Sequence, residues 1–476
     1  MDAQIGRRHL AAVDPRAGVG ARLDRLPGSR RTWLNVLLLS LGGAFEYYDL
    51  FFTGYVAPGM VHSGLFDRAS LGPLAFLADW GLQGIGSFVF STFAGLFIGA
   101  MLLAPAADRF GRRKVFIFSL LWYSAVNFLL AFQTSGFALD VCRFISGIGL
   151  GVQLVTIDTF IAELIPARDR GRAFAFSSVV TYCAVPVVAL LAWLLEPYTL
   201  FGLEGWRLVI IIGSTGALAA WTFQRNIPES PRWLVRKGRH QEALAIVARM
   251  ECLVVRETKR PLPSPLLIPD EDPGESRFSE IFSPAYRRRT SMLSIFHFFQ
   301  TIGFYGFAAL VPTLLVAKGI LVTKSLQYSF IIAVANPVGP LIGMAVADRI
   351  ERKWQICAAA MCVAAFGLWF AHATGLLLLL VLGIGVTLSN NWMSFAFHNY
   401  QAELFPTRIR SRAVGFVYSW SRVSAALAGL LIDYLLKAQG VTAVFIFIAI
   451  AMAMVVLSIG GFGPRTRNLG LEQIAH

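Results

Sequence analysis

The stretch Asp108-Arg-Phe-Gly-Arg-Arg-Lys114 determines how the rest of the chain is interpreted. It carries four positive charges and separates two apolar runs, residues 88–105 and residues 115–132. A short basic loop between two hydrophobic spans is typical of the cytoplasmic face of a bilayer. A related stretch, Asp348-Arg-Ile-Glu-Arg-Lys353, follows 240 positions later. The pair predicts a membrane-spanning chain that contains a repeated unit.

A second pair of segments repeats at the same offset. Residues 162–173 read Ala-Glu-Leu-Ile-Pro-Ala-Arg-Asp-Arg-Gly-Arg-Ala, and residues 402–413 read Ala-Glu-Leu-Phe-Pro-Thr-Arg-Ile-Arg-Ser-Arg-Ala. Two unrelated matches at one spacing are difficult to obtain by chance. We therefore expect two copies of one membrane unit.

The composition agrees with a membrane protein. Of the 476 residues, 56% are hydrophobic and 15% are charged, whereas a soluble chain carries about 25% charged residues. The apolar residues come in blocks of about 20, the length that crosses a bilayer as a helix. We predict an all-α membrane protein with twelve transmembrane helices in two six-helix, pseudo-symmetric bundles. The spans are expected at residues 33–57, 84–106, 115–133, 139–161, 173–195, 207–224, 292–316, 327–347, 355–372, 375–399, 413–436 and 441–462.

The positive charges gather on one side of this topology. Most of the 42 Lys and Arg residues fall in the two tails, in the loops after even-numbered spans and in a long central segment. This distribution predicts that both termini are cytoplasmic. It also accounts for much of the net charge of +14 without nucleic-acid binding. The expected parts are a disordered tail at 1–32, bundles at 33–224 and 292–462, a cytoplasmic central loop at 225–291 and a cytoplasmic tail at 463–476.

Several motifs together resemble the major facilitator superfamily, over essentially the whole chain. They are the basic loop with its repeat, Arg143-Phe-Ile-Ser-Gly-Ile-Gly-Leu-Gly151, Glu163-Leu-Ile-Pro with Arg170-Gly-Arg, and Pro228-Glu-Ser-Pro-Arg-Trp-Leu234. One departure is Ala104, where the family usually has a glycine. The resemblance implies two six-helix bundles around a central cavity that work by alternating access, with no cofactor.

The choice of branch within that superfamily rests on three spans. Sugar porters usually carry paired glutamines on the seventh span, a glutamine on the fifth and a Gly-Pro-x-x-Trp run on the tenth. Here the seventh has only Gln300, the fifth reads Ser177-Ser-Val-Val-Thr181 and the tenth reads Ser389-Asn-Asn-Trp-Met393. A hexose site is therefore disfavoured. Residues 45–52 and 418–423 are more similar to organic-acid and metabolite:proton symporters.

Two carboxylates, Glu46 and Asp49, lie in the first span. A charge at bilayer depth costs at least ~2.5–3.5 kcal/mol, so each needs a reason. Three positions apart, they share one helix face and cannot both ionise cheaply. We therefore expect one of them to take up and release a proton, as proton coupling requires. The alternative is that one pairs with a basic residue as a structural lock.

Arg143 lies in the fourth span with Gly147 and Gly151 below it. The small residues allow close helix approach, so Arg143 is expected to point into the cavity. The resemblance implies a part in proton transfer with Glu46 and Asp49. The structural alternative is that Asp140, one turn away, holds it.

Arg422 lies in the eleventh span on one face with Tyr418. A planar guanidinium suits a bidentate grip on a carboxylate, so both are expected to bind substrate. The alternative is a salt bridge from Arg422 to Glu46 or Asp49, since intramembrane charges often pair with one another.

Polar stripes on two further spans are expected to line the cavity, because apolar helices seldom turn such stripes to lipid. Each histidine in them could instead be a satisfied packing residue. The residues are His297, Gln300, Thr301 and Tyr305 on the seventh span and Asn391, Ser394 and His398 on the tenth.

Charged residues at the inner ends of the spans form a third group. In the superfamily these motifs build ion-pair networks that hold one conformation, so we interpret them as conformational switches. Asp158 is also expected near the cytoplasmic end, as part of a gate. The expected gating network is Asp108, Arg109, Arg112, Glu163, Arg172, Glu229, Arg232, Asp348, Arg349, Glu403 and Arg412.

The function we predict is secondary active transport by alternating access, as proton-coupled symport of a small organic acid or related metabolite. The alternative is a sugar or polyol:proton symporter. The chain has no nucleophile elbow, HExxH or GxxxxGK[ST] motif and no metal-ligand spacing, which disfavours an enzyme. Its five cysteines imply no disulfide framework. We expect a monomer in the plasma (inner) membrane, with an organic anion, protons and lipid as partners and no nucleic acid.

Overall fold

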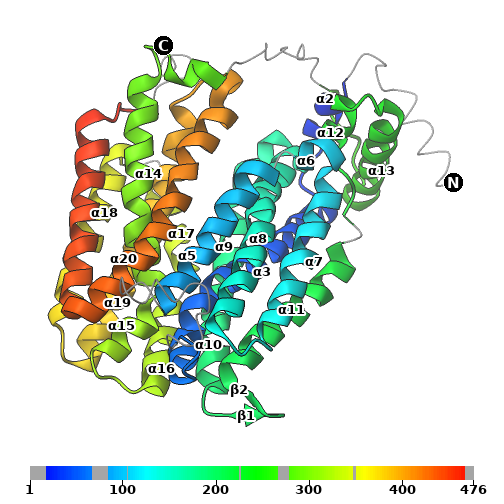
Figure 1. Ribbon diagram of the computed structural model, residues 1–476. Coiled ribbons are helices and arrows are strands. Elements are labelled where there is room, and N and C mark those ends of the chain that lie inside the picture. Colours follow the sequence, from blue (N-terminus) through cyan, green and yellow to red (C-terminus); the bar gives the residue numbers. More distant parts are fainter. Residues whose placement is uncertain are drawn as a thin grey trace.

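The computed structural model describes residues 18–66, 84–103, 106–224, 227–265, 278–346 and 350–466. The described chain is almost entirely helical, and the one sheet is a two-residue antiparallel pair of β1 (Thr199–Leu200) and β2 (Leu203–Glu204). The predicted all-α class is confirmed. The helices form two groups that stand side by side, the first half of the chain in blue to green and the second in green to red (Figure 1).

The helices of the first half cross the molecule six times. Within the crossings, α5 continues as a π-helical turn, η2, and α9 is followed directly by α10. The bounds are α3 (Arg30–His62), α5 (Ile85–Ile98) with η2 (Gly99–Leu103), α7 (Arg112–Leu130), α8 (Gly136–Leu164), α9 (Ala167–Tyr182) with α10 (Ala184–Leu195), and α11 (Gly205–Gln224).

The second half repeats this plan. Two of its crossings are broken helices, and its last two are joined as one long helix. The bounds are α14 (Arg287–Ala308) with α15 (Val311–Ala317), α16 (Val322–Ala333) with α17 (Val338–Val346), α18 (Arg352–His372), α19 (Leu376–Glu403), and α20 (Thr407–Val455) with η4 (Val456–Gly460).

Fewer than the twelve predicted spans are long and apolar enough, as continuous helices, to cross a membrane. Within the described residues seven do so, and α14 with α15, bent by 64°, makes an eighth. The difference has local causes. The helix α20 holds two crossings joined at Gly440, whose φ of 80° is not helical. The apolar parts of α5 and α11 are short, and α3 carries the buried carboxylates Glu46 and Asp49.

Small helices cover one end of the bundle, which we call the basic end. It carries α2 (Val19–Asp24), α6 (Ala106–Phe110), α12 (Pro231–Arg236) and α13 (His240–Thr258), seen at the top of Figure 1. A 3₁₀ turn, η3 (Phe278–Phe282), leads into α14.

The expectation of a disordered tail up to residue 32 is wrong for its described part. The Arg22 guanidinium of α2 donates to both oxygens of Glu251 at 3.1 and 2.6 Å, and Arg25, which directly follows α2, donates to Glu251 at 2.7 Å. Leu23 is fully buried. The segment is ordered because it buries an apolar face and pairs its charges with α13.

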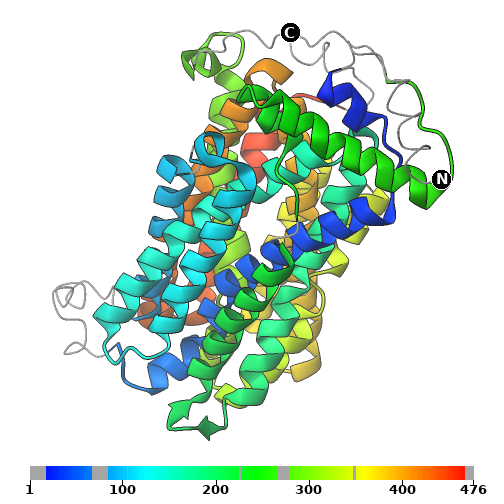
Figure 2. The ribbon, with the colours of Figure 1, turned by 90° about the vertical axis from the view of Figure 1, so that its right-hand side faces the viewer.

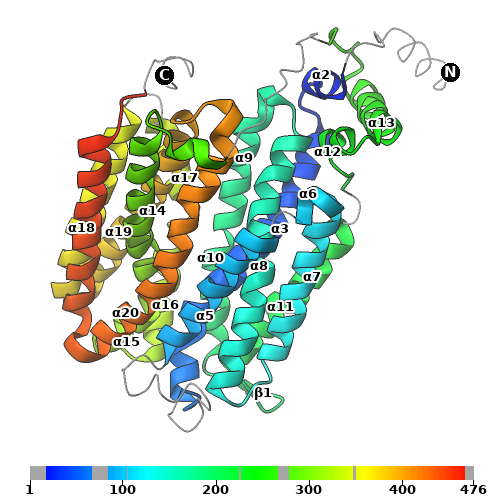
Figure 3. The same ribbon diagram turned by 45° about the horizontal axis from the view of Figure 1, so that its top comes forward.

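The two halves meet closely at the opposite end, which we call the closed end. Here a Cβ added to Gly54 of α3 would lie 1.4 Å from the carbonyl oxygen of Ala309. The Gly86 amide donates to Asp433 at 3.3 Å. Trp193 of α10 stacks on Phe330 of α16, with centroids 5.9 Å apart. From this end the halves diverge toward the basic end, as Figures 1 and 3 show.

Candidate functional site

A buried ion pair links α3 and α8 in the first half. Arg143 is fully buried and Asp49 is 3% exposed. The Nη1 of Arg143 donates to the two carboxylate oxygens of Asp49 at 3.0 and 3.1 Å, and its Nη2 donates to the Asp49 carbonyl at 2.7 Å. The alternative partner, Asp140, does not hold the arginine. Of the two structural possibilities, a lock through Asp49 is the one observed.

The remaining polar atoms of this arginine are also satisfied. Its Nε donates to Thr92 at 2.9 Å and its Nη2 to Thr53 at 2.8 Å, while the ring of Phe52 lies 4.5 Å from its guanidinium carbon. The amide of Asn127 donates to Asp49. The expectation that Arg143 points into an open cavity is wrong, because every nitrogen is bonded and the group is sealed from solvent.

Glu46 has a different environment, although it is only one turn from Asp49. It is 3% exposed, and its Oε1 has no hydrogen-bond partner in the described structure. The charged groups close enough to influence it are Arg422, Asp158 and Asp49. The two carboxylates therefore differ in their partners: Asp49 forms an ion pair with Arg143, whereas Glu46 forms none within the described structure.

Arg422 approaches this cluster from α20 in the second half. It is 3% exposed, its guanidinium lies 4.7 Å from the ring centre of Tyr418, and its Nη2 has no partner among the described residues. The structure records no ion pair within 4.0 Å between Arg422 and either Glu46 or Asp49. The alternative of a direct salt bridge is not observed.

Aromatic rings from both halves surround this space. Tyr305 of α14 contacts Phe93 of α5, with centroids 4.7 Å apart, and lies 6.4 Å from Phe51 of α3. Tyr47 of α3 packs edge-on against Tyr182 of α9 at 5.3 Å. Tyr418, Tyr305 and Tyr47 are the tyrosines close enough to Arg422 to interact with it. Tyr418, which was expected on one helix face with Arg422, and Tyr305, which was expected on the α14 stripe, both belong to this aromatic surround.

His297 lies in the packing of the second half. It is fully buried, its Nε2 is 2.8 Å from the Gln401 side-chain oxygen, and its ring packs edge-on against Phe397 and Tyr418. The prediction that it lines an open cavity is wrong. The packing alternative is the one that the contacts favour.

The two residues that follow on the α14 stripe are also internal. Thr301 donates to the carbonyl of His297 at 2.9 Å and to the Gln300 side chain at 3.3 Å. Gln300 is 5% exposed and Thr301 is 1% exposed. The Thr301 hydroxyl contacts the side-chain oxygen of Gln300, so the side-chain NH2 group of Gln300 is not used in this contact.

The α19 stripe differs from the predicted one in its first residue, which is Asn390 in place of Asn391. Asn391 donates to the carbonyl and side-chain oxygens of Asn336, at 3.2 and 3.1 Å, in the break between α16 and α17. Its expected place in the cavity is therefore wrong. Asn390 instead donates to the Gly303 carbonyl of α14 at 3.3 Å, and its side-chain oxygen has no described partner. Asn390, Ser394 and His398 are spaced four apart and share a face.

Two polar side chains are exposed, one on each half. They are Asp158 of α8, which was expected as part of a gate, and His398 of α19, which was expected in the cavity. The imidazole of His398 stacks on Phe397 at 4.2 Å, with its Nδ1 2.7 Å from the Ser394 carbonyl. Ser394 is also near the Tyr182 hydroxyl of the first half. These positions indicate a water-accessible crevice between the halves that opens toward the basic end.

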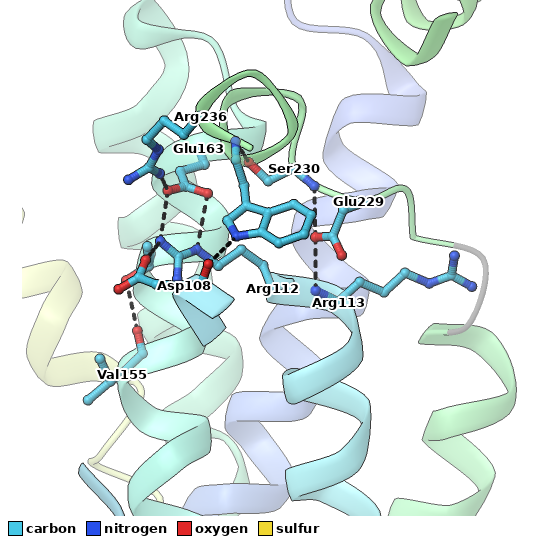
Figure 4. A network of polar contacts seen from close by, with 10 residues as sticks. Asp108, Arg112, Arg113, Val155, Glu163, Glu229, Ser230 and Arg236 are labelled. Atoms are coloured by element: carbon cyan, nitrogen blue, oxygen red, sulfur yellow. Dashed lines mark hydrogen bonds and ion pairs between the residues drawn. The ribbon is translucent and has the colours of Figure 1, made fainter. Parts of the chain in front are cut away.

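The ion pairs of the basic end repeat between the halves. Arg112 donates to both oxygens of Glu163 at 3.2 Å (Figure 4). In the second half Arg352 pairs with Glu403 at 2.7 Å. Both residues of the second pair follow the first by 240 positions, so the repeat in the sequence is also a repeat of contacts. Burial raises the pKa of the Glu403 carboxyl, while Thr466 and Arg352 act in the opposite direction.

Further contacts extend the first of these pairs (Figure 4). Asp108 lies 2.6 Å from Arg112, and its carbonyl accepts from the Trp233 indole at 2.8 Å. Arg236 of α12 also pairs with Glu163. Glu229 accepts from the amides of Arg113 and Ser230 at 3.1 and 3.0 Å.

The other predicted gating residues are placed differently. Arg232 pairs with Asp24 of α2 at 2.7 Å. This pair ties α12 to the N-terminal segment. Arg109, Arg172 and Arg412 are exposed. Asp348 and Arg349 lie outside the described residues.

Several residues of the site were missed by reasoning from the sequence. Each is a polar side chain within an apolar span or next to a known motif, which is the signal that could have found it. They are Thr53, Thr92, Asn127, Asn390, Gln401 and Arg236. Among the described residues, no group of His, Cys, Asp or Glu is arranged to hold a metal ion.

Comparisons with known proteins agree with the fold. The family model described as "Sugar (and other) transporter" matches residues 36–476. The putative metabolite transport protein YyaJ of Bacillus subtilis is 29% identical over 95% of this chain and 96% of its own length. The niacin transporter NiaP of Acinetobacter baylyi is 27% identical over 91% of this chain and 97% of its own.

Among solved structures, the partially occluded inward-open form of the xylose transporter XylE from Escherichia coli superposes with a TM-score of 0.73. The match covers 93% of this chain and all of the other at 18% identity, so it concerns the fold alone. It confirms the predicted major facilitator fold.

Proposed function

Because the chain belongs to the Sugar (and other) transporter family and is a multi-pass membrane transporter of the major facilitator superfamily, we propose that it carries a small organic acid together with protons. Bacterial relatives are described as inner-membrane transport proteins, and we place this chain in the same membrane. The basic end then faces the cytoplasm, with both chain ends on that side.

The observation that carries the proposal is the pair of unsatisfied groups in the centre. Arg422 has a free Nη2, and Glu46 has a free Oε1. Leaving buried charged groups unpaired is costly, so a ligand that satisfies them gains affinity. A carboxylate offers two oxygens to a guanidinium in a short, charge-assisted contact. We assign Arg422 to the substrate and Glu46 to the proton.

The sealed pair of Asp49 and Arg143 supports a second step in coupling. Protonation of Asp49 would remove the charge that holds Arg143, and a buried arginine without a counterion must find other partners. In this proposal the loss of that contact changes how α3 packs on α8. Glu46, Asp49 and Arg143 together then link proton uptake to the movement of the halves.

The aromatic surroundings favour a substrate with a ring. Tyr47, Tyr305 and Tyr418 lie around Arg422, and offset or edge-on ring contacts contribute about 0.5–1.5 kcal/mol beyond area burial. NiaP is named for niacin, which is an aromatic carboxylic acid. We therefore propose an aromatic monocarboxylate as the first class to test.

The proposal is tested with purified protein in liposomes that contain a pH-sensitive dye. We expect an organic acid added outside to acidify the lumen, because each substrate enters with a proton. Arg422→Ala should abolish both substrate binding and acidification. Arg143→Ala should retain binding and lose accumulation against a gradient.

Two results would overturn this assignment. Silence across a panel of aromatic and aliphatic acids, with uptake of a sugar or polyol instead, would replace the substrate class. Normal accumulation by both variants would remove the roles given to the two arginines. The unfolding temperature of each variant provides the control for correct folding.

A further inference from the structure

A cavity of about 1100 Å³ lies outside the central site, on the flank of the first half at the basic end. Its walls come from five segments: the start of α3, the end of α6, the start of α7, the stretch before and within α12, and one face of α13. The residues used below are Arg31, Leu34 and Leu38 of α3, Arg113, Lys114, Ile117, Phe118 and Leu121 of α7, and Arg239, Glu242, Ile246 and Arg249 of α13.

The two long helices change polarity in the same direction along this cavity. On α3 the lining runs from Arg31 to Leu38, and on α7 it runs from Arg113 to Leu121. Seven or eight residues of helix cover about 10–12 Å. Within that distance the wall passes from cationic to wholly apolar on both helices. Both apolar parts point down the bundle toward the closed end, within the membrane-spanning length of α7.

The helix α13 closes the cationic side of the cavity. Its lining residues Arg239, Glu242, Ile246 and Arg249 recur at the spacing of one helical face. Figure 2 shows this helix in green, crossing the basic end close to the start of the blue α3. The cavity thus has charged side chains on the side of α13 and apolar side chains on the side toward the closed end.

The charge of the lining is clearly positive. Five cations (Arg31, Arg113, Lys114, Arg239 and Arg249) stand against two carboxylates. Glu242 is paired with Arg239 at 2.6 Å. Glu229 accepts from two backbone amides. Because Glu242 and Arg239 neutralise each other, the lining keeps a net positive charge, and Arg31, Lys114 and Arg249 are its exposed cations outside that pair.

We propose that this cavity binds one anionic phospholipid from the leaflet on the basic side. Its phosphate lies among Arg31, Lys114 and Arg249, which are exposed, and one acyl chain follows Leu34, Leu38 and Ile117. Basic pockets between membrane helices on the cytoplasmic side bind anionic headgroups in this way. A soluble anion would use the cations and leave the apolar wall uncovered.

The site differs in place and ligand from the central crevice. It does, however, adjoin the basic-end ion pairs, since Glu229 and Arg113 belong to its wall and Arg113 follows Arg112 directly. A bound lipid would therefore bridge α3, α7 and α13 and stabilise the packing of the small helices on the first half. This inference does not depend on the transported substrate.

The test uses the full chain purified in a neutral detergent, with lipid binding measured by native mass spectrometry. We expect dioleoyl phosphatidylglycerol to remain bound after phosphatidylcholine has been lost. Arg31→Gln/Lys114→Gln/Arg249→Gln should weaken its binding on the order of tenfold or more, because each basic residue near an anionic headgroup contributes to attraction. The single variant Lys114→Gln should show a smaller loss in the same direction.

The matched control removes the same charge elsewhere on the basic end. Lys237→Gln/Arg256→Gln/Lys259→Gln changes three exposed cations that do not line the cavity, and it should bind the lipid as the parent does. Equal losses in the two triple variants would overturn the proposal, since they would indicate general attraction to the basic surface. Dihexanoyl phosphatidylglycerol or inorganic phosphate competing as well as the long-chain lipid would also overturn it, because the apolar wall would then play no part.

Discussion

At the scale of single residues, the two carboxylates of α3 show how partners decide role. Asp49 is held by Arg143, whereas the Oε1 of Glu46 has no described partner. Removing one member of a buried ion pair typically costs about 3–5 kcal/mol, and removing an unsatisfied buried group costs little or stabilises. We therefore expect Asp49→Ala to lower the unfolding temperature well below that of Glu46→Ala, measured in one detergent at one pH.

A double variant separates pairing from general damage to α3. Asp49→Ala/Arg143→Ala removes both charges, so its loss of stability should be smaller than the sum of the two single losses. Strictly additive losses would contradict a strong pair. In that case the contact between Asp49 and Arg143 would contribute little to stability, and its loss on protonation could not drive the coupling that we propose.

Another carboxylate, Glu196, predicts how stability depends on pH. It follows α10 at the closed end, outside the membrane-spanning segments. Burial, and to a lesser degree the charge of Glu204, raise its pKa from 4.5 to about 7. Between these values the folded chain binds more protons than the unfolded chain at this site. The contribution of Glu196 to stability therefore falls as the pH rises from about 4.5 to 7.

The variant Glu196→Gln cannot ionise and should remove this slope. We expect it to be more stable than the parent at pH 8, with the difference shrinking toward pH 5, in unfolding temperatures measured across that range. Glu242→Gln is the control, because the pKa of Glu242 is lowered by Arg239 and its titration lies below the range. Parallel curves for the parent and Glu196→Gln would show that Glu196 titrates normally.

At the scale of helices, the joint inside α20 has a clear chemical cause. Gly440 has φ 80° and ψ −173°, a region that is essentially restricted to glycine and costs other residues on the order of 1–3 kcal/mol. No atom lies within 4 Å of a Cβ placed there, so the strain comes from the backbone alone. We expect Gly440→Ala to lower the unfolding temperature.

Gly415 in the same helix provides the comparison. It is helical and also has open space around an added Cβ, so Gly415→Ala should be neutral or should raise stability, by up to about 1 kcal/mol. A similar loss of stability for Gly440→Ala and Gly415→Ala would contradict this explanation, because it would show that α20 is sensitive to an added methyl group along its length and not only at the joint.

The same helix shows what the sequence could predict. The spans 413–436 and 441–462 were separable because Lys437, Gln439 and Gly440 interrupt an apolar run, and the joint of α20 falls there. The 240-residue repeat anticipated the equivalence of Arg112 with Arg352 and of Glu163 with Glu403. These are local or repeated patterns, which hydropathy and spacing record directly.

The parts that could not be predicted depend on contacts between distant segments. Whether Asp49 or Asp140 holds Arg143 depends on how α3 packs on α8. The choice between Asn390 and Asn391 rests on a rotation of about 100° between neighbouring helix positions. The order of α2 follows from its pairing with α13, some 230 positions away. A composition rich in arginine favours disorder unless such partners exist.

At the scale of the whole molecule, the two halves are in contact at one end and separate at the other. The tight point is Gly54 of α3 against the carbonyl of Ala309, a contact that leaves no room for a side chain. A bundle that alternates must open this end in another state. Glycine at position 54 therefore stabilises the closed end by permitting backbone contact.

The variant Gly54→Leu should move the population toward the state that is open at this end. Its side chain cannot fit beside Ala309, and a ligand or side chain shifts a two-state equilibrium only by its differential energy in the two states. Labelling of single cysteines reports the shift, in a background that replaces all five native cysteines. We expect a cysteine at position 433, now buried against Gly86, to label faster. A cysteine at position 158, now exposed, should label more slowly.

The opposite responses of the two positions are what distinguish alternation from local loosening. If α3 merely lost packing at the closed end, position 433 would label faster and position 158 would not change. Gly415→Leu, which adds the same side chain at an open site, should leave both rates as they are. Faster labelling at both positions would mean that the two halves separate along their whole length. The crevice that we propose for substrate and proton would then be open at both ends at once, which contradicts alternating access.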